Sequence, residues 1–104
     1  MLNQVLLVGR VTETPEVKEL EEGKKLSYIT LAVQRSYKNE NGVYDTDFIP
    51  CILWNGIAIN TSEYCRKGDF VGVKGRIQSV EGKVKIVAEK VTFLSSRKPS
   101  EDNE

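Results

Sequence analysis

Residues 70–94 have the sequence FVGVKGRIQSVEGKVKIVAEKVTFL, and this stretch decides the fold class. Apolar and polar side chains alternate through residues 70–79 and again through residues 83–94, which is typical of strands with one buried face. Gly82 lies between the two segments and can adopt the positive φ that a tight turn requires. The stretch therefore predicts an antiparallel hairpin, and two glycines in its first strand allow strong curvature.

Three more strands are predicted on the N-terminal side of this hairpin. Residues 2–11 (LNQVLLVGRV) are rich in aliphatic and β-branched side chains, which favour strands. Residues 26–35 follow a short hairpin that turns at Gly23. Residues 46–54 follow a polar loop, residues 38–43, that contains an Asn-Gly pair. The chain therefore has five main predicted strands.

A single helix is predicted between the third and fourth of these strands. Within residues 57–67, apolar and small side chains recur at helical spacing, and Gly68 can end the helix. This order predicts an all-β fold with little helix, a five-stranded barrel whose helix crosses one end. An open α+β sheet is the alternative that the same order allows.

The length of 104 residues predicts one domain, which we assign to residues 1–95. The polar composition of residues 96–104 predicts a disordered tail. Apolar runs are far shorter than the ~20 residues that cross a membrane, so we expect no membrane partner. The N-terminus lacks a secretory signal, which predicts a cytoplasmic protein. Cys51 and Cys65 are then expected to be buried, reduced thiols, with a disulfide or a reactive thiol as the alternative.

The composition argues against an enzyme. The sequence has no histidine, and its two cysteines lie 14 positions apart and cannot complete a tetrahedral metal site. Basic and acidic side chains, 15 of each, balance overall, but residues 13–22 alone carry a net charge of −4 and residues 97–104 a net charge of −1. The remainder therefore carries +5. We expect no catalytic residue, no metal site and no cofactor, and a surface that suits a polyanion or is simply solvated.

The predicted strand 46–54 has two apolar sides. One side carries Ile49, Cys51 and Leu53, a small aliphatic set that fits a narrow barrel interior. Phe48 and Trp54 then face outward, where exposed rings are costly in water unless something such as a nucleobase stacks on them. Burial of these rings under a loop or in a subunit interface is the alternative.

Cations are interleaved with these rings. Tyr37 follows Arg35 by two residues, so both are expected to point the same way. We predict that Tyr37, Phe48 and Trp54 stack on bases and that seven cations bind phosphates. The predicted phosphate-binding residues are Arg10, Arg35, Lys38, Lys74, Arg76, Lys83 and Lys85. We expect the last four to share one surface of the terminal hairpin, with ordinary solvated lysines as the alternative. Four other rings are expected in the core or against the helix: Tyr28, Tyr64, Phe70 and Phe93.

Five segments resemble the bacterial single-stranded DNA-binding proteins in order and spacing. They are LNQVLLVGRV at 2–11 with TPEV at 14–17, ITLAV at 29–33 with RSY at 35–37, TDFI at 46–49 through LW at 53–54, SEYCRKG at 62–68, and VKGRI at 73–77. The resemblance covers residues 2–94. It implies an oligonucleotide-binding (OB) fold, a Greek-key barrel, in a non-catalytic, nucleoid-associated protein. Such proteins assemble as homotetramers and bind single-stranded DNA without sequence preference in replication, recombination and repair.

By the same resemblance, Tyr37, Phe48 and Trp54 match positions whose rings stack on bases, and the first strands of two chains form the dimer contact. Three features depart from the family. The terminal hairpin is short and lacks an aromatic residue, so Lys83 and Lys85 are expected to hold DNA by charge alone. Pro50 is expected to be unpaired or bulged. The chain does not end in the family's acidic tip, so recruitment of repair proteins through that tip is not expected. An OB-fold protein-interaction module, with weak or no DNA binding, is the second functional hypothesis.

Overall fold

The computed structural model describes residues 1–95, and the predicted tail, residues 96–104, lies outside the described residues. The elements in chain order are β1 (Val5–Val11), β2 (Lys18–Glu19), the short 3-10 helix η1 (Glu21–Gly23), β3 (Lys25–Lys38), β4 (Tyr44–Trp54), α1 (Asn55–Tyr64), β5 (Phe70–Val80) and β6 (Lys83–Ser95).

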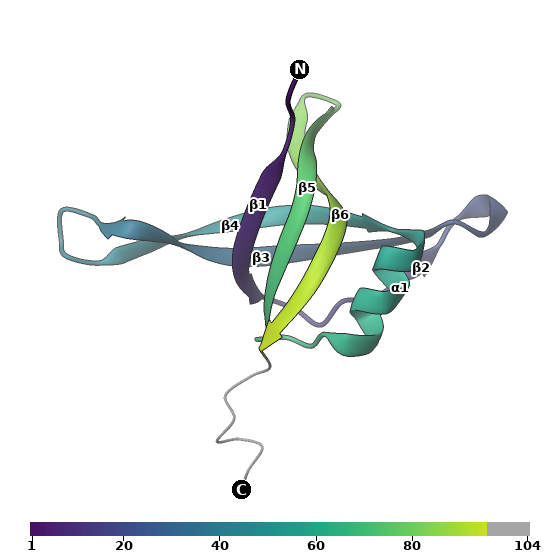
Figure 1. The fold of residues 1–104 in the computed structure, drawn as a ribbon, viewed down its shortest axis with the longest axis horizontal. Helices are drawn as coiled ribbons and strands as arrows, with labels where there is room; N and C mark the ends of the chain where they lie inside the picture. Colours follow the sequence, from purple (N-terminus) through teal and green to yellow (C-terminus); the bar gives the residue numbers. More distant parts are fainter. Residues whose placement is uncertain (96–104) are drawn as a thin grey trace, which may run out of the picture.

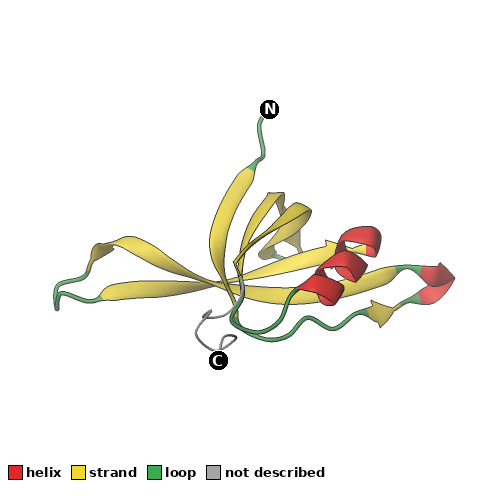
Figure 2. Cartoon of the chain, turned by 60° about the horizontal axis from the view of Figure 1, so that its bottom comes forward, coloured by secondary structure: helices red, strands yellow, loops and turns green. Residues whose placement is uncertain are grey.

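The strands close into a barrel. Their order is β1-β5-β6-β4-β3-β2, and a further pairing between β1 and β3 closes these five strands, with the short β2 outside the closed set (Figure 1). The pairing of β4 with β6 is parallel, and the other pairings are antiparallel. The predicted five-stranded barrel is confirmed, and the open sheet is excluded. Helix α1 begins directly after β4 and packs against β3, β4 and β6; Figure 2 shows it in red beside the strands.

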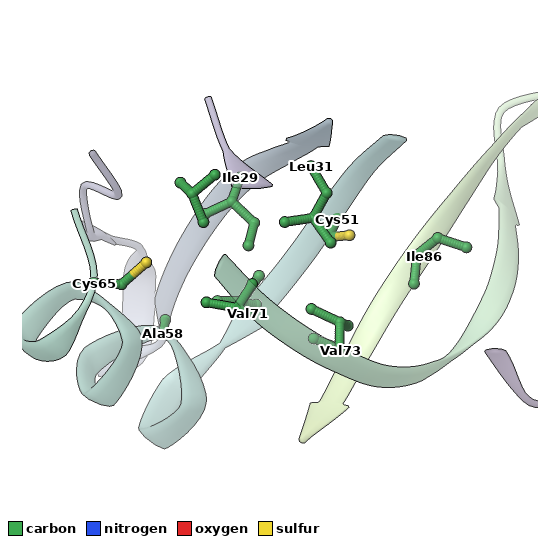
Figure 3. Close-up of a cluster of buried hydrophobic side chains, with 11 residues drawn as sticks. Ile29, Leu31, Cys51, Ala58, Cys65, Val71, Val73 and Ile86 are labelled. Atoms are coloured by element: carbon green, nitrogen blue, oxygen red, sulfur yellow. The ribbon is translucent and has the colours of Figure 1, made fainter. Parts of the chain in front are cut away.

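The core consists of the inward-facing positions of the strands together with two residues of the helix region. Its buried members are Val11, Ile29, Leu31, Cys51, Leu53, Ala58, Cys65, Val71, Val73, Ile86 and Ala88 (Figure 3). Burial of both thiols, as predicted, is confirmed. It also raises the pKa of Cys51 to about 11, because a buried thiolate loses its hydration.

Gly75 permits a close approach between β5 and β6. A Cβ atom at this position would collide with the carbonyl oxygen of Val87 on β6. The β5–β6 register also shifts between Lys74 and Gly75. The two strands therefore approach each other more closely than any residue with a side chain would permit.

The predicted bounds of the helix and of three strands are wrong by more than one residue, and the first of these strands, β1, begins at Val5 rather than at residue 2. The helix spans Asn55–Tyr64 rather than residues 57–67, because the chain is already extended at Cys65 and the Arg66 N–H donates to Asp69 Oδ2 at 2.8 Å. Strands β3 and β4 continue three and two residues further than predicted, toward a tighter loop. The Asn39 side chain holds that loop by accepting hydrogen bonds from the backbone N–H groups of residues 41 and 43.

Pro50 is neither unpaired nor bulged, contrary to prediction. It lies in regular register opposite Thr30. The Thr30 carbonyl accepts a hydrogen bond from the Thr12 N–H at 3.0 Å, so the backbone of Thr30 faces away from β4. An antiparallel ladder alternates between pairs that exchange hydrogen bonds and pairs that do not. Pro50 occupies a pair of the second kind, where the β3–β4 ladder requires no N–H donor.

Candidate nucleic-acid interface

Strand β4 presents two different faces. Cys51 and Leu53 have no exposed surface, whereas the Phe48 side chain is 64% exposed and the Trp54 side chain is 38% exposed. This is the result expected of a strand, because successive side chains point to opposite faces. The two rings therefore lie on the outer surface of the barrel, as the alternation predicts.

Neighbouring strands extend this outer surface, because residues opposite each other across a ladder point to the same face. On β3, Ala32 lies opposite Phe48 and Leu26 lies opposite Trp54. On β1, Arg10 lies opposite Ala32, so its side chain leaves the same face of the sheet as Phe48, with β3 between the two strands. An open groove of about 410 Å³ runs along this part of the surface. Its lining residues are Val8, Gly9, Arg10, Ala32, Gln34, Thr46 and Phe70.

Tyr37 lies in a different place. Residues 35–45, which we call the arm, form the end of the β3–β4 hairpin that projects from the barrel (Figure 1). The Tyr37 ring is exposed in this arm. The ladder is irregular between Gln34 and Lys38, so simple alternation does not give the direction of Tyr37 relative to Arg35. The three predicted rings thus follow one long hairpin from its tip to the end of β4.

Arg35 forms the strongest ion pair of the arm. Its Nε donates to Asp47 Oδ2 at 3.1 Å and its Nη2 donates to Asp47 Oδ1 at 2.9 Å, while its Nη1 lies 3.7 Å from Asp45 Oδ2. The hydrogen bond from Arg35 holds the pKa of Asp47 below its usual range, and the same bond raises the pKa of Arg35. Asp47 points away from the face of its neighbour Phe48, so Arg35 lies on the side opposite that ring.

The four predicted cations of the terminal hairpin share one face. Lys74 and Arg76 lie two positions apart on β5 and therefore point to the same face, which Gln78 and Val80 share. The register places Lys85 opposite Gln78 and Lys83 opposite Val80. The parallel pairing of Val87 with Ile52 makes this face continuous with the Phe48 and Trp54 side of β4. The predicted shared surface is therefore confirmed. It also contains Lys90, opposite Lys74, which the sequence analysis did not identify.

These cations differ in what they contact. Arg76 Nη1 lies 3.2 Å from Glu89 Oε2. The guanidinium carbon of Arg10 lies 4.2 Å from the centroid of the Phe70 ring, and its Nη1 donates to the Gly68 carbonyl at 2.9 Å. Lys38 Nζ lies 5.7 Å from the centroid of the ring of Tyr44, an exposed aromatic that the sequence analysis also missed.

Tyr28 is not a core residue, contrary to prediction. Its side chain is 51% exposed on the outer face of β3, and Lys85 Nζ lies 5.3 Å from its ring centroid. The signal was present in the sequence, because the inward positions Ser27 and Ile29 flank it. Tyr64 and Phe93 do pack together at the helix, with ring centroids 6.0 Å apart, but both remain exposed. Phe70 is half-buried beneath Arg10.

Within residues 1–95, no three His, Cys, Asp or Glu side chains are placed to hold a metal ion. No helix of this same range has the length and apolar character needed to cross a membrane.

Comparison with known proteins gives a consistent result. A family model described as "Single-strand binding protein family" matches residues 2–94. Single-stranded DNA-binding protein B of Bacillus subtilis is 48% identical, over 76% of this chain and 70% of the relative. Single-stranded DNA-binding protein 3 of Listeria innocua is 41% identical, over 93% of this chain and 66% of the relative. Single-stranded DNA-binding protein 1 of Clostridium acetobutylicum is 39% identical, over 93% of this chain and 97% of the relative.

Proposed function

The chain belongs to the single-strand binding protein family, and on that premise we propose that it binds single-stranded DNA without sequence preference. The observation that carries the proposal is the exposure of Phe48 and Trp54 on the face of β4 whose other side fills the core. Bases stack on Tyr37, Phe48 and Trp54, each worth roughly 1–3 kcal/mol, and every base offers the π-face that this contact needs.

Phosphate neutralisation supplies the second part of the affinity. The proposed phosphate contacts are Arg10, Arg35, Lys38, Lys74, Arg76, Lys83 and Lys85, of which Arg35 and Arg76 already pair with carboxylates and contribute least. Among residues 1–95, Lys74 and Lys83 form no ion pair, so their charges are available to a polyanion. The proposed role is binding alone, with no chemical step, and it protects single strands in the cytoplasm and nucleoid during replication, recombination and repair.

We further propose a homotetramer whose dimer contact is β1 against β1 of a second copy. Within the described chain, β1 pairs with β5 from Val5 to Arg10 but with β3 only at Arg10 and Val11. The other edge of residues 5–9 can therefore accept another strand. Leu6 and Val8, both more than half exposed on β1, gain burial in such an assembly.

The test uses Trp54, which is the only tryptophan of the chain. Titration with oligo-dT should quench its fluorescence, because a base stacks directly on the indole ring. The affinity should fall as salt rises, because phosphate contacts release counterions. Unchanged emission together with no binding at low salt would refute the proposal. Nothing in residues 1–95 or in the comparisons favours the alternative of a protein-interaction module.

A further inference from the structure

Tyr28 lies on the part of the outer surface between Phe48 and Trp54, where β4 itself carries no aromatic side chain. These two residues are six positions apart on one strand, which corresponds to about 20 Å. Nucleotides rise about 3.4 Å each along a duplex strand, so even a strand stretched to twice that rise passes about three nucleotides over this distance. The bases between the two proposed platforms need a further surface if they are not to remain in water.

The register places the Tyr28 ring on the correct face and at an intermediate position. Tyr28 lies directly opposite Ile52, one outward position from Trp54 and two from Phe48. Diagonal neighbours of this kind are about 7–8 Å apart, close to the spacing of bases in a stretched strand. Tyr28 and Trp54 can therefore hold two consecutive bases, or two bases with one nucleotide between them.

Two apolar neighbours and one cation beside Tyr28 suit a nucleotide, whereas Glu13 and Glu16, which line a pocket together with Tyr28, do not. Beside it, Ile52 and Val87 are buried although they lie on the outer side of their strands, so they form an apolar floor next to the ring. Lys85 Nζ lies over the ring, 5.3 Å from its centroid. A lysine side chain is flexible, so its ammonium group can turn from the ring to a phosphate when a base takes its place.

We propose that Tyr28 is an additional stacking platform, which holds a nucleobase between those on Phe48 and Trp54 while Lys85 contacts the phosphate of that nucleotide. The inference rests on the proposed function of single-strand binding. It places the phosphate contact of Lys85 beside a stacked base on Tyr28.

The first experiment compares three variants by Trp54 quenching with oligo-dT. Tyr28→Ala should weaken binding about 5- to 150-fold, the range for one lost base–aromatic stack. Tyr28→Phe keeps the ring and should bind like the unmodified protein. Tyr64→Ala removes an exposed ring at the helix and is the matched control, with unchanged affinity expected. Circular dichroism establishes that each variant is folded.

Salt titration separates the two proposed roles. Tyr28→Ala should leave the slope of log K against log salt unchanged, whereas Lys85→Ala should flatten it by about 0.7, the value for one single-strand phosphate contact. If the unmodified protein binds and Tyr28→Ala binds equally well, the platform is refuted and the proposed function stands. If the unmodified protein neither binds nor is quenched, the proposed function itself fails.

A second measurement needs no variant and therefore does not depend on folding of Tyr28→Ala. Oligonucleotides that carry 5-iododeoxyuridine are bound to the unmodified protein and irradiated, and the cross-linked peptides are identified by mass spectrometry. A cross-link at Tyr28 supports the platform. Cross-links at Phe48 or Trp54 with none at Tyr28 overturn it.

Discussion

Replacing Arg35 with glutamine should change the salt dependence of DNA binding far less than replacing Lys74 with glutamine. Arg35 forms two hydrogen bonds to Asp47 and lies 3.7 Å from Asp45 Oδ2. Its positive charge is thus already matched by carboxylates on the face opposite Phe48. Lys74 forms no ion pair within residues 1–95, and it shares its face with Lys90.

The expected size follows from counterion release. Each phosphate contact on a single strand contributes about −0.7 to the slope of log K against log salt. If all seven proposed cations bind phosphates, the slope is about −4.9 per protomer. If Arg35 and Arg76 remain bound to their carboxylate partners, five contacts are left and the slope is about −3.5. Lys74→Gln should then lose about 0.7 of slope, and Arg35→Gln close to none.

The assay is the Trp54 quenching titration with oligo-dT, repeated at several salt concentrations for the unmodified protein and both variants. Thermal unfolding measured alongside shows whether the loss of the Arg35–Asp47 pair has disturbed the arm. A slope near −4.9, or an equal flattening by the two substitutions, would show that Arg35 leaves its carboxylate partners for phosphate and that the reasoning is wrong.

Three further predictions concern the fold, its pH dependence and its assembly. Gly75→Ala should abolish folding or severely destabilise the protein, because its Cβ would overlap a carbonyl oxygen of β6. The control Gly56→Ala in α1 meets nothing within 4 Å and should be neutral or slightly stabilising. Urea unfolding measures the stability of both variants. Arg35 lowers the pKa of Asp47, so this carboxylate stabilises the fold above its unfolded pKa and the effect disappears as pH falls through the lower folded pKa. The difference in melting temperature between Asp47→Asn and the unmodified protein should therefore shrink in acid. Leu6→Glu, on the exposed side of β1, should lower the mass measured by light scattering, and a mass already monomeric without the substitution contradicts the proposed tetramer.

The outward direction of Phe48 and Trp54 was predictable because it depends on one strand alone. A strand has a fixed period of two, and only the smaller set of Ile49, Cys51 and Leu53 fits inside a narrow barrel. The position of these rings on the barrel surface follows from the same rule applied to each neighbouring strand. This part of the candidate site needed no knowledge of long-range contacts.

The contacts of Arg35 and the exposure of Tyr28 were not predicted, for different reasons. The Arg35–Asp47 pair depends on the register across a hairpin of unknown length, and β3 and β4 extend further than their apolar patterns indicate. Tyr28 was assigned to the core because its segment is apolar, although its position in the alternation of inward and outward side chains pointed outward. For an aromatic residue in a half-buried strand, the alternation is therefore a better guide than the hydrophobicity of the segment.

Pro50 favours the β3–β4 register in which Cys51 is buried and Phe48 and Trp54 are exposed. A slip of one residue in the β3–β4 register would turn Phe48 and Trp54 toward the interior and the buried thiol of Cys51 toward water. The same slip would move Pro50 to a position where the ladder requires an N–H donor, which proline lacks. In the observed register Pro50 faces Thr30, whose backbone bonds to Thr12 instead of to β4. Proline is thus compatible with the register that exposes the rings and incompatible with the register that would bury them.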